Sequence, residues 1–354
     1  MFTGGRGTAS LAETFIAHPQ IELFLLVNAY DDGLSTGRLR RFIPGLLGPS
    51  DIRKNIVNLL PDTDEAGRAL KRLLEYRFPT TLNAENANLI LSGLYNTELD
   101  REKSGLQPQF WNDLESVSYK QARYIESQVL SFLAYWQQEY KKGKNFDFED
   151  CSFGNIIFSG AFLRLGSDFN QTITDLENEF NSAGRVVNVT QGENYVLVGL
   201  KSDGTYLRDE AEIVSPQNSQ VMEDIYLLEN YLSESEIQNL NNCIDLESKK
   251  KFLIKKNREP HISIVAQSIL DTADLIIFGP GTQHSSLYPS YLTLGVGEAI
   301  SNNQIAEKVF IANTHKDHEI QGESIISLCH KLHYYLNRKG EIKLSQEKLV
   351  TRYF

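Results

Sequence analysis

The chain has 354 residues, of which 41% are hydrophobic, and its 18 Phe and 16 Tyr can supply a substantial core, so the composition excludes a globally disordered protein. Asp and Glu outnumber Lys and Arg by 46 to 35, and the formal net charge of −11 disfavours nucleic acid as a partner. No apolar run approaches the roughly 20 residues that a membrane-spanning helix needs, so we expect no membrane partner.

The cysteines and the first residues indicate the compartment. Cys151, Cys243 and Cys329 lie far apart and form no CxxC pair, which argues against a disulfide framework or a structural zinc site. The first residues lack the charged and apolar regions of a signal peptide. We therefore expect a cytoplasmic protein. The oligomeric state stays open, a homo-oligomer included.

The first 60 residues alternate helix and strand signals. Residues 9–17 predict a helix that ends at His18-Pro19, and residues 51–60 predict another that ends at Pro61. Between them, residues 21–27 form the continuous apolar run that is typical of a buried parallel strand. This alternation predicts an α/β fold with a doubly wound, Rossmann-like, mostly parallel sheet.

The middle of the chain is mostly helical over residues 62–145. Apolar residues three and four apart predict helices at 64–76 and 114–141. Two further helices are predicted after this region, at 153–165 and 169–181. Strands are predicted at 185–190 and 195–200, and Asp203-Gly204 predicts a hairpin turn. Residues 215–258 are polar and charged, which predicts a helical insertion whose lysine runs face solvent.

The α/β pattern resumes at residue 274. The predicted elements are a strand at 275–278, a helix at 290–301, a strand at 308–312 and a helix at 322–337. We interpret residues 1–354 as a single α/β domain that contains the helical region and the insertion.

A glycine cluster opens the chain at Gly4, Gly5 and Gly7, with Thr8 next to the first predicted helix. Glycine lets backbone N–H groups approach a phosphate, and a helix N-terminus favours negative charge. An ordinary turn explains the cluster equally well, because Ser10 stands where a GxGxxG pattern has its third glycine. Only three residues precede Gly4, so either the first strand is short or upstream residues lie outside this sequence.

Two adjacent carboxylates, Asp31 and Asp32, follow Asn28 at the end of the strand predicted at 21–27. Ligands of doubly wound sheets bind beyond such carboxyl ends. The pair could hold Mg²⁺ against a diphosphate or accept the proton of a substrate hydroxyl. The alternative, a turn with two solvated acids, stays open at this point.

Arginines cluster after the acid pair in an otherwise acidic chain. They are Arg38, Arg40, Arg41 and Arg53, and Asp51 lies beside the last of them. The planar guanidinium suits phosphate oxygens. We therefore predict an anion site.

A second glycine-containing loop follows the strand predicted at 275–278. It runs Gly279-Pro280-Gly281-Thr282 and continues to Ser285-Ser286, and Asn313 follows the next predicted strand. These positions suit a ligand loop or an ordinary β–α connection. Ser285-Ser286 lacks a GxSxG elbow, which disfavours a hydrolase triad. The pairs His315/His318 and His330/His333 lack a third metal ligand, so we expect no metal there.

Taken in order, these segments resemble the 2-phospho-L-lactate transferase-like (CofD-like) family, and most closely its gluconeogenesis-factor (YvcK-like) branch. The resemblance rests on GGRGT, NAYDDGLSTGRLRR, GPSDIRKNIVNL, CSFGNIIFSGAFL, ADLIIFGPGTQHSSLYPSYL and VFIANT. It covers residues 1–60, 150–205 and 260–325, and residues 62–145 and 215–258 match less clearly.

The resemblance implies a Rossmann-like fold with a nucleotide or nucleotide-sugar in its cleft. In the transferase branch, a phospholactyl group moves from a guanosine diphosphate-linked donor to a deazaflavin alcohol with Mg²⁺. The gluconeogenesis-factor branch implies instead a uridine diphosphate-sugar binder that regulates carbon metabolism and cell-wall formation. Both a transferase and a non-catalytic regulator therefore remain open.

The family pattern also implies roles for particular residues. The phosphates would lie against Gly4, Gly5, Gly7 and Thr8, the metal or acceptor hydroxyl against Asp31 and Asp32, and the anion against Arg38 and Arg53. Asn155 would lie in the cleft, and the base or ribose would meet Gly279, Gly281, Thr282 and Ser286. Asn28, Asp51 and Asn313 complete the set of candidate ligand-binding residues.

This chain departs from the family pattern at three places. Leu34 stands where the pattern DDGGSSG has its second glycine. Gln283-His284 replaces a Leu-Tyr-type pair, and residues 314–318 replace an acidic, glycine-containing loop. These departures bear on the identity of the ligand.

Overall fold

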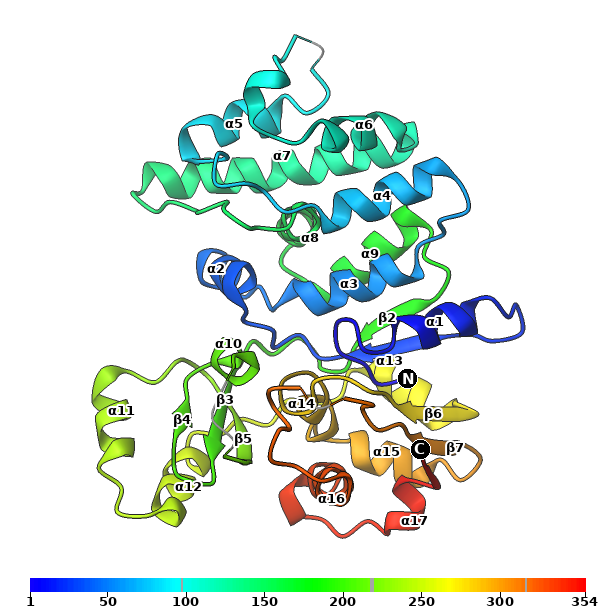
Figure 1. The fold of residues 1–354 in the computed structure, drawn as a ribbon, viewed down its shortest axis with the longest axis vertical. Coiled ribbons are helices and arrows are strands. Elements are labelled where there is room, and N and C mark those ends of the chain that lie inside the picture. Colours follow the sequence, from blue (N-terminus) through cyan, green and yellow to red (C-terminus); the bar gives the residue numbers. More distant parts are fainter. Residues whose placement is uncertain (97, 217–219, 316) are drawn as a thin grey trace. The chain divides into compact units, whose positions relative to one another are not determined.

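The fold is known from a computed structural model that describes residues 1–96, 98–216, 220–315 and 317–354 (Figure 1). The chain forms two compact units. The first comprises Met1–Thr8, Phe24–Asp32 and Val187–Phe354, and the second comprises Ala9–Leu23 and Gly33–Val186. The prediction of one domain for the whole chain is not tested by this division. No helix in the described residues combines the length and apolar character that crossing a bilayer requires.

The first unit is built on a parallel sheet, as predicted. Strand β6 (Leu275–Phe278) pairs in parallel with β7 (Glu307–Phe310), which pairs in parallel with β8 (Arg352–Tyr353). Strand β1 (Phe24–Val27) pairs with β2 (Arg185–Asn188), and the division between the units falls within β2. The α/β class with a mostly parallel arrangement is therefore confirmed.

A single residue, Phe2, joins these strands into one row. It forms parallel bridges to Leu26 in β1 and to Phe278 in β6. Its N–H donates to Ile277 O at 2.8 Å, and the Thr3 N–H donates to Leu26 O at 3.1 Å. The Phe2 ring stacks on the Phe278 ring with centroids 5.6 Å apart. Within the described residues, the expected first strand is thus reduced to one bridging position.

In the part of the chain that the structure describes, five helices and a large hydrophobic core cluster pack around this sheet. They are α13 (Ile264–Thr272), α14 (Tyr288–Tyr291), α15 (Val296–Asn302), α16 (Ile325–Leu336) and α17 (Gln346–Leu349). The single helix predicted at 290–301 is wrong. A π-helix (Gln283–Leu287) leads into α14, and α15 starts after Gly295, whose φ of +95° interrupts the helix.

The first unit also contains an antiparallel sheet in the order β4-β3-β5. Strand β3 (Val196–Lys201) pairs with β4 (Tyr206–Leu207) and with β5 (Met222–Leu228). The hairpin predicted at Asp203-Gly204 is confirmed by the pairing of β3 with β4. Helix α10 (Glu210–Val214) follows β4.

The prediction of a purely helical insertion at 215–258 is wrong, because β5 lies within it. Ile225 and Leu227 join the large core, whereas Tyr226 and Leu228 join a smaller one, so the strand is buried on both faces. Helices α11 (Glu234–Asn241) and α12 (Leu246–Ile254) supply the helical part of the insertion. Residues 217–219 lie outside the described residues.

The second unit is helical over the range in which helices were predicted. Its helices are α1 (Ala9–Ile16), α2 (Leu34–Phe42), α3 (Pro49–Leu59), α4 (Glu65–Glu75), α5 (Ala84–Ser92), α6 (Pro108–Ser116), α7 (Tyr119–Lys141), α8 (Phe153–Arg164) and α9 (Phe169–Phe180). The helix predicted at 114–141 is two helices, α6 and α7. Ser118 separates them because it forms a capping box with Gln121.

Helices α7 and α8 pack so closely that one position admits only glycine. A Cβ atom on Gly160 of α8 would lie 1.8 Å from the Gln128 carbonyl oxygen of α7. The backbone of α7 at Gln128 cannot move away as a flexible side chain can. Any side chain at residue 160 would therefore push the two helices apart.

We predict that Gly160→Ala lowers the free energy of unfolding by about 1–3 kcal/mol because it overpacks this contact. Urea-induced unfolding monitored by circular dichroism measures the effect. The matched control is Ser159→Ala in the same helix, since Ser159 is fully buried and its hydroxyl has no partner among the described residues. Ser159→Ala should change stability little, and equal losses in the two variants would contradict the packing argument.

Candidate functional site

Twelve of the candidate residues lie in the first unit, in the segments that follow Phe2, β1, β6 and β7. They are Gly4, Gly5, Gly7, Thr8, Asn28, Asp31, Asp32, Gly279, Gly281, Thr282, Ser286 and Asn313. The other four belong to the second unit, and they are Arg38, Asp51, Arg53 and Asn155. In a parallel sheet the carboxyl ends of neighbouring strands meet at one edge, which places the first group together.

The two glycine-containing loops of the first unit touch through their backbones. A Cβ atom on Gly7 would lie 2.5 Å from Pro280 O, and one on Gly279 would lie 2.6 Å from the Thr8 Cγ2 atom. The Thr3 and Thr8 hydroxyls share a hydrogen bond beneath the first loop. Glycine is therefore required at residues 7 and 279 by close approach, which the sequence motif alone did not establish.

Asn313 and the Gly-Pro-Gly loop form a reciprocal pair of hydrogen bonds. The Gly281 N–H donates to Asn313 Oδ1 at 2.9 Å, and Asn313 Nδ2 donates back to Gly281 O at 2.8 Å. Asn313 therefore fixes the loop that the preceding strand end presents. The Thr282 and Ser286 hydroxyls lie 2.8 Å apart at the other end of the loop.

Asn28 holds the same loop from the end of β1. Its Nδ2 donates to Ser286 O, and it lies 3.4 Å from the Ser290 hydroxyl oxygen. The Asn28 side chain is 3% exposed, so its contacts are to the protein interior. Ser290 is a contributor that the sequence did not indicate, because only the fold brings residues 28 and 290 together.

The two adjacent aspartates lie in different surroundings. Asp32 is buried, its Oδ2 accepts a hydrogen bond from the Tyr231 hydroxyl, and its N–H donates to Glu210 Oε2 at 3.1 Å. Asp31 is half-buried. Glu210 begins α10 and Tyr231 follows β5. Sequence reasoning missed both residues, since no local pattern marks a residue whose contact with Asp32 spans 178 positions of the chain or more.

The acid pair suits a hard cation such as Mg²⁺ in its donor atoms, because magnesium prefers carboxylate oxygens together with phosphate and water oxygens. Among the described residues, no group of three or more His, Cys, Asp or Glu side chains could hold a metal ion. Asp31 and Asp32 would therefore need ligand or water oxygens to complete the coordination.

A buried polar cluster lies in the second unit. Arg53 Nε donates to Asn155 Oδ1 at 3.2 Å, Asn155 Nδ2 donates to Ser50 Oγ at 3.0 Å, and Ser50 Oγ lies 2.5 Å from Thr36 Oγ1. Arg53 is 2% exposed. Ser50 and Asn155 lie in the first turns of α3 and α8, where helix N-termini carry partial positive charge. A buried guanidinium beside two such termini favours an anion.

The other two candidates of the second unit, Arg38 and Asp51, each form an ion pair within the protein. Arg38 pairs with Asp147 and also donates to Glu149 O. The Asp51 carboxylate pairs with the Lys54 ammonium group at 2.8 Å. Their assignment to a ligand stays a prediction.

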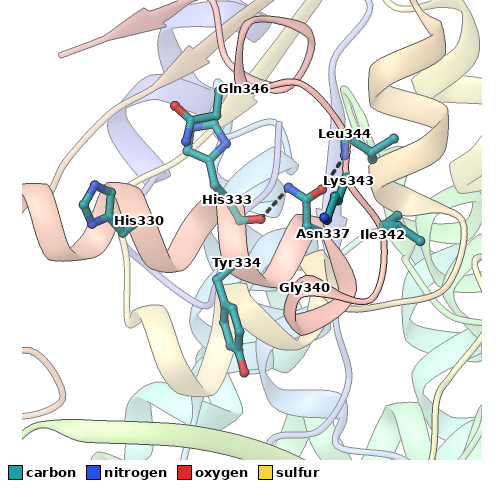
Figure 2. Close-up of a pocket in the computed structure, with 9 residues that line it drawn as sticks. All are labelled: His330, His333, Tyr334, Asn337, Gly340, Ile342, Lys343, Leu344 and Gln346. Carbon is teal, nitrogen blue, oxygen red and sulfur yellow. Dashed lines mark hydrogen bonds between the residues drawn. The ribbon is translucent and has the colours of Figure 1, made fainter.

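A cavity of about 390 Å³ lies elsewhere in the first unit, between α16 and the segment that follows it (Figure 2). Its lining includes His330, His333 and Lys343, none of which was a candidate. The His333 ring is bound to the Tyr353 hydroxyl at 2.6 Å, and burial lowers the pKa of His333. The Asn337 amide bridges His333 O and Leu344 N. The contacts of the described residues around this cavity therefore involve none of the candidate ligand-binding residues.

We predict that Gly7→Ala lowers the free energy of unfolding by about 1–3 kcal/mol, because the new methyl group would collide with the Pro280 carbonyl. Thermal or urea unfolding measures this loss. Arg6→Ala is the control, since Arg6 is the exposed neighbour in the same loop. A Gly7→Ala protein as stable as Arg6→Ala would show that the two loops do not pack this closely.

The sequence matches known proteins over nearly its whole length. The family described as 2-phospho-L-lactate transferase CofD matches residues 1–350. A protein of Thermotoga maritima, described provisionally as a gluconeogenesis factor, is 22% identical over 99% of this chain and 80% of its own length. A gluconeogenesis factor of Halalkalibacterium halodurans is 23% identical over 88% of this chain and 65% of its own length.

The fold is also similar to a solved structure. The crystal structure of a UPF0052 family protein from Bacillus halodurans superposes with a TM-score of 0.60 at 19% identity, over 99% of this chain and 77% of that one. At this identity the likeness concerns the fold. The family match over residues 1–350 identifies the chain as a member of the CofD family.

Proposed function

We propose that this chain is a nucleotide- or nucleotide-sugar-binding protein whose ligand places its diphosphate against the glycine loops of the first unit. The observation that carries the proposal is the contact of Gly7 with Pro280, where a Cβ atom would lie 2.5 Å from the carbonyl oxygen. The Gly279 and Gly281 N–H groups already donate to Phe2 O and Asn313 Oδ1, so the proposal assigns the phosphates to the backbone of residues 5–7, which glycine lets a ligand approach closely.

The rest of the loop supports binding of the remaining parts of such a ligand. Thr282 and Ser286 offer hydroxyl groups that suit a ribose or a base. Asn28 and Asn313 hold this segment by three of the hydrogen bonds described above. A loop fixed in this way loses little conformational entropy when a ligand binds.

Magnesium is proposed as the cofactor, with Asp31 and Asp32 as its protein ligands. When bound, it would neutralise part of the diphosphate charge beside two carboxylates. The Arg53 and Asn155 cluster of the second unit is proposed as a second anion-binding element, because its guanidinium is buried next to helix N-termini.

A transferase reaction is the activity that the family description supports. In the step that we propose, the oxygen of an acceptor hydroxyl bonds to the phosphorus that carries the phospho-linked group. The bond from that phosphorus to the nucleoside monophosphate breaks, and the leaving oxygen keeps the electron pair. The hydroxyl proton passes to the carboxylate of Asp31, which is less buried than Asp32.

A non-catalytic regulator that senses a uridine diphosphate-sugar is the second candidate. It is favoured by the likeness to gluconeogenesis factors and by the contact of Asp32 with Tyr231. Tyr231 and Glu210 come from the antiparallel part of the first unit. Ligand binding at Asp32 would therefore change the conformation of the antiparallel part, and this part would present a changed surface to a partner protein.

The shared binding proposal predicts that a nucleotide stabilises the protein in the presence of Mg²⁺. Uridine diphosphate glucose, guanosine diphosphate and adenosine diphosphate form the test panel in a thermal unfolding assay. At about 100 times its dissociation constant, a ligand should raise the stability by roughly 2.7 kcal/mol. Absence of a shift with every member of the panel would refute nucleotide binding.

The aspartates separate the two functions. The test uses a nucleotide that the unmodified chain binds. If the chain is a transferase, Asp31→Asn should abolish product formation because it removes the proton acceptor, and the affinity for the nucleotide should stay within about tenfold of that of the unmodified chain. Isothermal titration and an assay of released nucleoside monophosphate make the comparison. Asp271→Asn, an exposed acid on α13, is the control. If the unmodified chain gives no turnover over a broad screen of acceptor alcohols, the regulator is favoured.

A further inference from the structure

A buried polar cluster lies beneath the Gly-Pro-Gly loop, centred on Glu319. The Glu319 Oε2 atom accepts hydrogen bonds from the His284 N–H at 2.8 Å and the Ser285 N–H at 3.1 Å. Its Oε1 atom lies 2.5 Å from the Ser285 hydroxyl oxygen. Both carboxyl oxygens are thus engaged by the π-helix Gln283–Leu287, and the Glu319 side chain is only 1% exposed.

This geometry suits a carboxylic acid as well as a carboxylate. In the acid form, the carbonyl oxygen accepts both N–H groups, and the hydroxyl group donates to Ser285 Oγ. Both carboxyl oxygens then have a hydrogen-bond partner and no charge is buried, while the Ser285 hydroxyl accepts from Glu319 and no longer donates to it. A carboxylate would accept the same three contacts but would bury its negative charge.

The surroundings of Glu319 do not supply a direct cation. The His284 ring is fully buried, and burial lowers its pKa well below the usual value, so the ring is neutral. Its Nε2 lies 3.3 Å from Lys331 Nζ, and its Nδ1 lies 3.9 Å from Glu319 Oε2. Lys331 is itself paired with Glu323.

The net result is a carboxyl group that keeps its proton near neutral pH. Burial raises the pKa of Glu319 to about 8, although its hydrogen bonds to Ser285 and His284 lower it. The negative charge of Asp317 acts in the same direction as burial. The titratable groups around Glu319 are Asp317 from its own segment, His284 from the π-helix and Tyr288 from α14. Lys331 of α16 reaches His284, and it is paired with Glu323, which precedes α16.

We propose that Glu319 is a positioning residue for the ligand loop, and that its carboxyl group, in the acid form, fixes the backbone that presents Thr282 and Ser286. This inference rests on the proposed nucleotide function. Asn28 holds the carbonyl of Ser286 from β1, whereas Glu319 holds the N–H groups of residues 284 and 285 from the segment after β7. Removal of either anchor frees one side of the loop.

Two of the departures from the family pattern lie next to Glu319 or to the residues that it contacts. Gln283-His284 and residues 314–318 are two of the places at which this chain differs from that pattern. In the structure, one departure lies on the π-helix that Glu319 contacts, and the other directly precedes Glu319. The Asp317 side chain accepts the Glu319 N–H at 2.9 Å and so fixes the turn that carries Glu319.

The first test compares Glu319→Ala with Glu319→Gln in the intact chain without ligand. Glutamine keeps an oxygen that can accept the two N–H groups and an N–H that can donate to Ser285 Oγ, so it should preserve the loop. Glu319→Ala should raise the hydrogen-exchange rates of the amides in residues 283–287 by about tenfold or more. Glu177→Gln is the control, because Glu177 is a buried carboxyl group that accepts the Val186 N–H in the second unit.

The second test measures binding of uridine diphosphate glucose with Mg²⁺ between pH 6.5 and 9. Affinity in the unmodified chain should fall about fivefold as the pH rises through about 8, because a negative charge then develops beneath a loop that holds a diphosphate. Glu319→Gln stays neutral, so its affinity should not show this fall. Glu319→Ala should bind weakly at every pH, and Glu177→Gln should behave as the unmodified chain does.

The outcomes separate this inference from the proposed function. The positioning role is refuted if the unmodified chain binds uridine diphosphate glucose and Glu319→Ala has the same amide exchange rates and the same affinity as the unmodified chain. A fall in affinity that Glu319→Gln shows equally would refute the acid form. If the unmodified chain binds no nucleotide, the proposed function fails, and this inference fails with it as a statement about a ligand. The exchange rates then decide only whether Glu319 fixes the loop.

Discussion

The position of Phe2 between β1 and β6 is the constraint on which the first unit depends. Its backbone is bonded to Ile277 on one side, and its neighbour Thr3 is bonded to Leu26 on the other. Three chain segments that are distant in sequence therefore end side by side. Their following loops must share one edge of the sheet, and glycine allows these loops to touch there.

This constraint explains how an acidic chain can be expected to bind an anion. The twelve candidate residues of the first unit include no lysine or arginine. Their contribution to phosphate binding would come from backbone N–H groups, which carry no net charge and need no counter-ion. The buried guanidinium of Arg53 lies in the second unit. The net charge of −11 therefore does not argue against an anion site whose donors are backbone N–H groups.

The sequence predicted those helices and strands that depend on residues close together in the chain. The apolar run at 275–278 coincides with β6, and α4 and α9, each capped by an aspartate, begin within one residue of their predicted starts. Strand β5 was missed because its residues divide between two cores, so no single polar face marks it. Tyr231, Glu210 and Glu319 act through contacts with residues distant in sequence, and a single sequence carries no record of such contacts.

The site is also more divided than the sequence indicates. The motif presents Asp31 and Asp32 as an equivalent pair, but only Asp32 is buried and bound to Tyr231. Two carboxyl groups in different surroundings can serve different functions, one in holding the structure and one in chemistry. Asp32 therefore connects the ligand edge to the antiparallel sheet in either function. In the proposed transferase the reaction would depend on the single carboxylate of Asp31, whereas the proposed binding would depend on the backbone around it.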